Sequence, residues 1–348
     1  MRLALIARAD SRGLGNQTAD LHRHMSPVST ICVDMSANTP YRQHFGRFPG
    51  AHVATPAELV ATAARAGWFS GAVDVILTAE TPYDYSLWTE AAAAKVGTVC
   101  QVNPEFWPYA RSPDLPRPTI AVSPTGWLNH RMPDVRVLPH PVDRARFPHE
   151  ARGTSETVTF LHVAGHKAMM DRNGTGTVMQ ALSRIRRSCR FVIRSQSPLS
   201  DLAGRAPQHV DVDVVVADLD DPADLYAGAD VLVAPRRYGG QSLPLNEAAS
   251  CGLALVVSDV DPQNGFVPPA GRVPCTRRRR FLTQGGAVDA WQADPRALAA
   301  KIDELVDDRV LLADLCAASD RYAASISWGR LKGDWLRLLA EAAKAARP

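Results

Sequence analysis

Residues 230–252 read DVLVAPRRYGGQSLPLNEAASCG. The apolar run Val231–Ala234 predicts a buried strand that ends at Pro235. A Gly-Gly turn follows, and Ser242 with Pro244 predicts the cap and first turn of a helix. Such a strand–turn–helix unit presents free N–H groups and the positive end of a helix dipole, which suits a phosphate. Glu247, about one turn into the helix, faces the same side and can accept hydrogen bonds from hydroxyl groups.

Short apolar runs alternate with longer helical patterns on both sides of this stretch. The first series predicts strands at Leu3–Ala7, Ser29–Val33, Val73–Thr78 and Thr98–Val102, with helices at Thr18–His24, Pro56–Ala66 and Glu90–Lys95. The second predicts strands at Val158–Ala164, Arg190–Arg194, Val210–Val216 and Ala254–Ser258, with helices at Gly176–Arg186, Pro222–Ala227 and Leu245–Ser250. This alternation is typical of parallel sheets covered by helices.

The chain is long enough for two domains. It has 348 residues, and one domain usually contains roughly 100–200. Three prolines between residues 138 and 148 suppress regular structure, so we expect the linker near residues 141–153.

Composition excludes several classes of protein. The 39 basic and 36 acidic residues leave a net charge of +3, which disfavours binding of nucleic acid by overall charge. Six scattered cysteines contain no Cys-x-x-Cys pair, so neither a zinc site nor a disulfide framework is expected, and a cytoplasmic setting fits. The first apolar run is too short for a signal peptide, and no run approaches 18 apolar residues, so we expect neither export nor a membrane span.

A second glycine-containing turn, DSRGLGNQ at residues 10–17, follows the first predicted strand. Gly13, Gly15 and Asn16 are candidate contacts for an anion. The third glycine of a dinucleotide fingerprint is missing, and only Asp34 could take the ribose-binding position, which disfavours an NAD-dependent oxidoreductase. An ordinary strand-to-helix turn is the alternative.

The stretch 230–252 resembles the donor-binding segment of the GT-B glycosyltransferases, in particular the large retaining family four. In that family two glutamates are separated by seven residues; Glu247 takes the place of the second, and the first falls on Gly239. The resemblance implies that Glu247 holds the nucleotide ribose, whereas Gly239 lacks the side chain that contacts the donor sugar in the family. The donor-binding candidates in this stretch are Gly239, Gly240, Gln241, Ser242, Leu243 and Glu247.

The resemblance extends over most of the chain. Residues 160–174 look like the strand and loop that supply two cations to the donor diphosphate, and Lys167 and Arg172 are the candidates here. Solvated loop charges are the alternative. The implied organisation is two Rossmann-like domains facing each other across a cleft: an acceptor-side domain at 1–148, a nucleotide-sugar domain at 149–326, and a helix at 327–348 that crosses back to the first domain.

Three polar residues follow strands of the first domain, namely Glu80, Asn103 and Glu105. The family commonly has a histidine where Asn103 falls, close to the reacting sugar. Asparagine cannot act as a base, so Asn103 is expected to donate hydrogen bonds, and Glu80 or Glu105 to orient or deprotonate an acceptor hydroxyl. Helix capping and loop polarity are the alternative.

No metal is expected. The ten histidines form no helical pair beside a carboxylate. Asp211-Val212-Asp213 matches a metal motif of the other major glycosyltransferase fold but begins an apolar strand. Since GT-B enzymes usually work without a catalytic metal, we expect no cofactor beyond the nucleotide-sugar substrate.

The strongest charge run is Arg277, Arg278, Arg279 and Arg280, followed by Phe281. Four adjacent arginines suit a polyanion, and the phenylalanine could stack on a base. A solvated hairpin explains them equally well. Arg184, Arg186, Arg187 and Arg190 form a second cluster, expected at an exposed helix end.

The acceptor is predicted from a narrower resemblance. The Gly13–Gln17 turn and the Asn103–Trp107 segment look like short glycosyltransferases of bacteriophages and actinobacteria, which modify DNA pyrimidines, virion proteins or glycans. We expect a 5-hydroxymethylpyrimidine in DNA, such as hydroxymethylcytosine, as acceptor, in the cytoplasm of a bacterial host. A virion protein, a saccharide, or a sugar-nucleotide-binding protein without turnover are the alternatives; no pattern predicts the sugar, the nucleotide base or an oligomeric state.

Overall fold

The chain forms two compact units. The computed structural model describes residues 1–39, 41–152, 155–165, 169–199 and 206–347. Unit 1 contains Met1–Pro141, Thr283–Gly286 and Trp328–Pro348, and unit 2 contains Val142–Leu282 and Ala287–Ser327.

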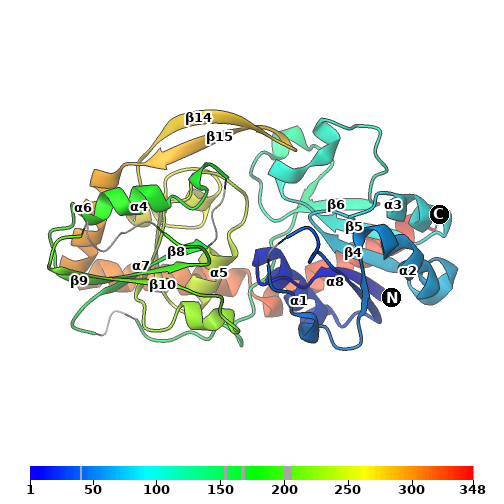
Figure 1. Ribbon diagram of the computed structural model, residues 1–348, viewed down its shortest axis with the longest axis horizontal. Coiled ribbons are helices and arrows are strands. Elements are labelled where there is room, and N and C mark those ends of the chain that lie inside the picture. The colour runs from blue at the N-terminus through cyan, green and yellow to red at the C-terminus, as the bar shows by residue number, and fades with distance from the viewer. Residues whose placement is uncertain (40, 153–154, 166–168, 200–205, 348) are drawn as a thin grey trace. The chain divides into compact units, whose positions relative to one another are not determined.

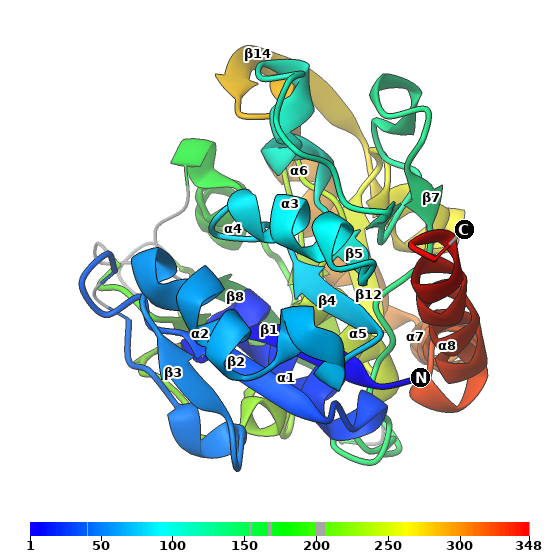
Figure 2. The ribbon, with the colours of Figure 1, turned by 90° about the vertical axis from the view of Figure 1, so that its right-hand side faces the viewer.

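Unit 1 is built on a seven-stranded parallel sheet with the order β3-β2-β1-β4-β5-β6-β7 (Figure 2). Its strands are β1 (Leu3–Arg8), β2 (Ser29–Val33), β3 (His52–Ala54), β4 (Val75–Ala79), β5 (Gly97–Gln101), β6 (Ile120–Ser123) and β7 (Arg136–Val137). Its helices are α1 (Gly13–Met25), α2 (Leu59–Arg65), α3 (Ser86–Ala93) and α8 (Trp328–Ala345). All residues of β4 and β5 are buried, as expected for strands covered on both faces.

The last helix, α8, belongs to unit 1 and packs against β5. Gly97 permits the close approach, because a Cβ there would lie 2.4 Å from the carbonyl oxygen of Ala342. Trp335 is fully buried, and its indole N–H donates to the carbonyl of Pro139 at 3.1 Å. A large apolar side chain with a satisfied polar group therefore anchors the helix.

Unit 2 is built on a six-stranded parallel sheet with the order β10-β9-β8-β11-β12-β13 (Figure 1). Its strands are β8 (Thr159–Gly165), β9 (Cys189–Ser195), β10 (Val210–Val216), β11 (Val231–Ala234), β12 (Ala254–Ser258) and β13 (Arg272–Val273). Its helices are α4 (Thr175–Leu182), α5 (Leu243–Ser250), α6 (Pro295–Asp307) and α7 (Arg309–Ser325).

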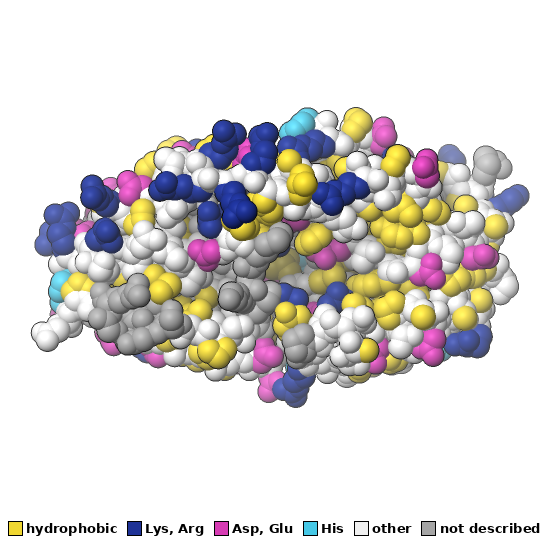
Figure 3. All heavy atoms as spheres, turned by 45° about the horizontal axis from the view of Figure 1, so that its top comes forward, with side chains coloured by type: hydrophobic (Ala, Val, Ile, Leu, Met, Phe, Trp, Pro, Cys, Tyr) yellow, Lys and Arg dark blue, Asp and Glu magenta, His cyan; other side chains and the backbone are white. Residues whose placement is uncertain are grey.

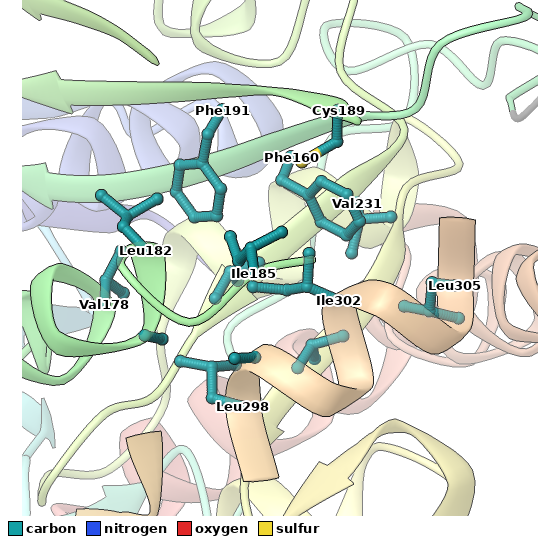
Figure 4. Packing of buried hydrophobic residues seen from close by; sticks show 14 of the residues in the cluster. Phe160, Val178, Leu182, Ile185, Cys189, Phe191, Val231, Leu298, Ile302 and Leu305 are labelled. Atoms are coloured by element: carbon teal, nitrogen blue, oxygen red, sulfur yellow. The ribbon is translucent and has the colours of Figure 1, made fainter. Parts of the chain in front are cut away.

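One hydrophobic cluster joins the sheet of unit 2 to α4 and α6 (Figure 4). The rings of Phe160 on β8 and Phe191 on β9 stack with centroids 6.0 Å apart. Leu182 from α4 and Ile302 from α6 complete the contact. This packing fixes α4, whose first residue follows the loop after β8.

The arginine run lies in a two-stranded sheet formed by β14 (Cys275–Thr283) and β15 (Gly286–Ala293). The tip of this hairpin is grouped with unit 1, where the N–H of Gly285 donates to the carbonyl of Glu105 at 2.9 Å. The arginine run therefore stands in a regular hairpin.

The predicted strand–helix alternation is confirmed in both units, with local differences. A helix was predicted at residues 222–227, but only the short 3-10 turn Pro222–Leu225 forms there. Gly228, which has a positive φ, follows soon after and ends the turn. The short strands β3, β6 and β7 were not predicted; β7 has two exposed residues and no apolar pattern to reveal it. Residues 141–152 contain neither helix nor strand, as the prolines predict. Within the described residues, no helix has the length and hydropathy needed to cross a bilayer.

Candidate functional site

The turn between β11 and α5 is a buried glycine turn at the carboxyl end of the sheet. Gly239 and Gly240 are both buried, and Gly239 has φ +115°, a conformation that L side chains rarely adopt. Ser242 takes the N-cap position of α5, and its side chain makes no capping bond. Gln241, Ser242 and Leu243 are partly exposed at the helix start, where N–H groups are available to an anion.

Glu247 lies inside α5 and is 6% exposed. Its Oε2 accepts a hydrogen bond from the hydroxyl of Tyr226, which is fully buried. Burial, together with the charge of Glu247, raises the pKa of Tyr226 well above its ordinary value, so the tyrosine keeps its proton and donates. Tyr226 therefore fixes the orientation of the carboxylate, a role that nothing in the sequence pattern revealed.

The described residues just before α4 have unusual backbone conformations and are well anchored. Met170 and Asp171 have φ values of +57° and +51°, which are unusual for residues with a side chain. The Asp171 carboxylate accepts hydrogen bonds from the N–H groups of Thr175 and Gly176, each at 3.0 Å, at the start of α4. Burial raises the pKa of Asp171. Lys167, one of the two predicted phosphate-binding cations, lies outside the described residues.

Residues 170–174 and the turn after β11 are fixed to each other, because β8 and β11 are neighbours in the sheet. The N–H of Arg237 donates to the carbonyl of Arg172 at 2.9 Å, and its guanidinium donates to the carbonyl of Met170 at 2.6 Å. At Gly174, a Cβ would lie 2.0 Å from the carbonyl of Pro235. Arg172 is thereby held beside the glycine turn, with its guanidinium 5.5 Å from the ring centroid of Tyr238.

The structure thus brings the described donor candidates of unit 2 together at one end of its sheet. The set consists of Arg172, Gly239, Gly240, Gln241, Ser242, Leu243 and Glu247. Sequence reasoning missed Arg236 and Tyr238, although both stand in the quoted stretch. For Arg236, the available signal was the cationic pair Arg236-Arg237, which follows a buried strand and Pro235. This is the end of a parallel sheet where ligands bind.

In unit 1, the loops after β4 and β5 bring Glu80 and Asn103 together. Asn103 Nδ2 donates to Glu80 Oε1 at 2.7 Å. Glu80 has φ +65°, and its N–H donates to the carbonyl of Gln101 at 2.6 Å. Glu105 follows in the turn Pro104–Phe106 and is 2% exposed. The three predicted catalytic residues therefore lie on two adjacent loops, and Glu80 and Asn103 form a hydrogen-bonded pair.

The first glycine turn has a clear packing role. A Cβ on Gly15 would lie 1.9 Å from the carbonyl oxygen of Asp10, so this glycine lets α1 approach the end of β1. Gly13 is exposed at the start of α1, and Asn16 Oδ1 accepts a hydrogen bond from Arg47 at 2.8 Å. The close packing explains Gly15 without a ligand.

Two arginines near this turn were also missed. Arg8 forms an ion pair with the fully buried Asp10. Arg12 lies over the ring of Tyr41, 3.9 Å from its centroid, and burial lowers its pKa. Cationic groups therefore stand at the carboxyl end of the unit 1 sheet as well.

The hairpin arginines are exposed, and basic side chains gather on the face that carries β14 and β15 (Figure 3). Arg277 and Arg280 share Asp289, at 3.8 and 2.8 Å. Among the residues described, Arg278 and Arg279 form no ion pair. Phe281 packs edge-on against Tyr238 with centroids 4.9 Å apart.

The second basic cluster is largely neutralised. Arg186 pairs with Asp303 at 3.2 Å, and Arg187 with Asp307 at 2.7 Å. Arg190 lies 3.8 and 3.4 Å from the carboxylates of Asp211 and Asp213, so the Asp-Val-Asp motif belongs to this surface pairing. In the described ranges, no three His, Cys, Asp or Glu side chains are grouped as metal ligands would be.

Comparison with known proteins assigns this architecture. Residues 158–308 match the family model described as "Glycosyl transferases group 1". Among curated proteins, no sequence matches the chain. The chain has the GT-B fold, and its segment 158–308 is similar to group 1 glycosyltransferases.

The fold is also that of several solved structures. Alr3699/HepE from Anabaena, in complex with UDP and glucose, has a TM-score of 0.68 at 10% identity, covering 98% of this chain and 100% of that chain. Sucrose-phosphate synthase from Thermosynechococcus elongatus has a TM-score of 0.65 at 16% identity, covering 98% and 100%. A glycosyltransferase from Rickettsia africae has a TM-score of 0.65 at 10% identity, covering 98% of both chains. At these identities the likeness concerns the fold.

Proposed function

We propose that this protein is a glycosyltransferase that transfers a sugar from a nucleoside diphosphate sugar to an acceptor hydroxyl, with retention of the anomeric configuration. The observation that carries the proposal is the grouping of Arg172, the glycine turn and Glu247 at one end of the unit 2 sheet. This group lies within the segment matched by the glycosyltransferase model. The solved HepE complexes contain UDP or UDP-glucose, which makes UDP-sugars the first donors to test.

Each residue of the group has a distinct proposed role. Glu247, oriented by Tyr226, accepts hydrogen bonds from the ribose hydroxyls. Arg172 and the N–H groups at the start of α5 stabilise the charge that develops on the departing diphosphate. Because guanidinium groups and amides supply this stabilisation, we propose turnover without a bound metal; activity should survive EDTA, and abolition by the chelator would contradict this part.

Glu247→Ala tests the donor site. A carboxylate that accepts two ribose hydroxyls contributes charge-assisted hydrogen bonds, so nucleotide affinity should fall roughly tenfold to hundredfold by calorimetry. Glu304→Ala, which removes an exposed carboxylate on α6, is the matched control and should bind normally. Unchanged affinity in Glu247→Ala would remove Glu247 from the site.

We further propose that the enzyme is of the short phage and actinobacterial type and that its acceptor is a 5-hydroxymethylpyrimidine in DNA. Support comes from the exposed hairpin, where Arg278 and Arg279 form no ion pair within the described chain and can neutralise phosphates. DNA presents a regular phosphate backbone to these arginines, whereas a virion protein or a saccharide does not.

The acceptor is tested by incubating a panel of nucleotide sugars with hydroxymethylated DNA, plain DNA and saccharides, read by mass. Modification of a saccharide or protein alone would overturn the DNA proposal, and donor binding without nucleotide release would indicate a binding protein. Replacing the residues Arg277, Arg278, Arg279 and Arg280 by serine should weaken DNA binding and flatten its salt dependence. The double variant Arg186→Ser and Arg187→Ser, which removes paired arginines, should change neither.

A further inference from the structure

The side-chain space of residue 239 is occupied by two guanidinium groups. A Cβ built on Gly239 would lie 2.5 Å from Arg172 Nη2 and 2.9 Å from Arg236 Nη2. Since φ is +115°, the backbone also disfavours any residue except glycine. At the position where the resembled family has a carboxylate, this chain therefore presents two cations.

Both arginines are held in place by contacts within unit 2. Arg236 is 6% exposed, and its Nη1 donates to the carbonyl of Gly240 at 3.4 Å. Arg172 is fixed through its carbonyl, which accepts from the N–H of Arg237, and its guanidinium lies over Tyr238. Tyr238 is itself packed against Phe281. Contacts from several segments of unit 2 thus hold the two guanidinium groups next to Gly239.

Two like charges close to one point repel each other, and the repulsion grows as water is excluded. An oxyanion between them reverses the sign of the interaction, and the guanidinium fork matches the geometry of phosphate and carboxylate oxygens. The start of α5, three residues after Gly240, adds a positive helix end at the same turn.

We infer that Arg172 and Arg236 together form an oxyanion subsite above Gly239 that holds an oxyanion of the donor. This inference rests on the proposed function and adds Arg236, which no motif assigned. A nucleoside diphosphate sugar offers the terminal phosphate and, when the sugar is acidic, a carboxylate. In the transfer, the bond between the anomeric carbon and the phosphate oxygen breaks with its electron pair going to that oxygen. The acceptor oxygen bonds to the anomeric carbon and loses its proton to a base, while the subsite stabilises the diphosphate.

Calorimetry on the full chain compares wild type, Arg236→Gln and Arg236→Lys with UMP, UDP, UDP-glucose and UDP-glucuronate, and with the guanosine and adenosine mono- and diphosphates. In Arg236→Gln, affinity for the diphosphate should fall roughly tenfold to hundredfold while affinity for the monophosphate stays within about twofold. Arg236→Lys should recover part of the loss, because it keeps the charge without the fork. A loss confined to UDP-glucuronate would place the sugar carboxylate in the subsite instead of the terminal phosphate.

Two further variants keep the test falsifiable. Gly239→Ala places a methyl group against both guanidinium groups and should reproduce the selective loss. Arg187→Gln, which removes a surface arginine paired with Asp307, is the control and should bind like wild type. Thermal unfolding confirms that each variant is folded.

Equal losses for mono- and diphosphates, or no loss, in both Arg236→Gln and Gly239→Ala would overturn the subsite. If wild type binds none of the nucleotides, the proposed function itself fails and the subsite falls with it. The two failures are therefore distinguished by the wild-type titration alone.

Discussion

At the scale of single residues, the proposed donor site depends on side chains that orient other side chains. We propose that Glu247 binds the nucleotide, and its carboxylate is oriented by the hydroxyl of the fully buried Tyr226. Arg172 is set by the backbone of Arg237 and by the ring of Tyr238. Buried partners of this kind hold a group in one geometry, so that a ligand does not have to order it on binding.

Tyr226→Phe should show whether Tyr226 orients Glu247 for binding or only stabilises the fold. The variant keeps the ring but removes the hydroxyl, leaving a buried carboxylate with one hydrogen bond fewer. Stability should fall by about 1.5–3 kcal/mol, and nucleotide affinity should fall roughly tenfold. Tyr109→Phe is the control in unit 1: it loses a hydrogen bond to the carbonyl of Pro116, so it should lose stability but retain affinity. Normal affinity in Tyr226→Phe would show that Glu247 is oriented without this bond.

At the scale of elements, glycines determine how closely helices approach strands. Gly15 lets α1 pack on the end of β1, and Gly97 lets α8 pack on β5. In both cases the neighbour is backbone, which cannot rotate away as a side chain can. A larger residue at Gly15 or Gly97 would therefore displace the whole helix, since no side-chain rotation can relieve the clash.

Gly97→Ala should therefore loosen α8. The added Cβ would lie 2.4 Å from the carbonyl oxygen of Ala342, and overpacking of this kind costs about 1–3 kcal/mol. Gly126→Ala is the matched control in the same unit, since a Cβ there meets nothing within 4 Å and the backbone φ is not positive. Chemical denaturation compares the two, and equal free energies of unfolding would disprove the close-packing argument.

At the scale of the whole molecule, buried histidines make stability depend on pH. Burial, with a contribution from His24, lowers the pKa of His140 to about 3, and burial lowers that of His162 to about 4. In the unfolded chain both titrate near 6.5. The unfolded state therefore binds more protons between these values, so the free energy of unfolding decreases as pH falls below about 6.5.

His140→Asn tests this dependence. Each histidine should contribute a decrease of about 1.4 kcal/mol per pH unit below 6, continuing to its own folded pKa. Urea unfolding at pH 7, 5.5 and 4.5 measures how the free energy of unfolding decreases with falling pH. This decrease should be smaller in the variant than in wild type by the contribution of one histidine. Carboxylates titrate in the same range, but they contribute equally to both proteins. Parallel slopes would mean that His140 is not kept neutral by its surroundings.

The sequence by itself determined the alternation of strands and helices, the parallel sheets and the position of the glycine turn between β11 and α5. These are local properties: a run such as Val231–Ala234 forms a strand because its neighbours are apolar, and Pro235 with Gly239 and Gly240 ends it. The spacing between the Gly-Gly turn and Glu247 is equally local, which is why a candidate site could be proposed from one stretch.

Only the tertiary structure decided which side chains meet. Arg172 and Arg236 are 64 positions apart in the sequence (236 − 172) yet both reach the space above Gly239, and Tyr226 finds Glu247 from a separate turn. The number of residues between two positions does not give their distance across a sheet, because packing and crossover connections make β8 and β11 neighbours. The pairing of cations at residue 239 is therefore visible only once β8 and β11 lie side by side.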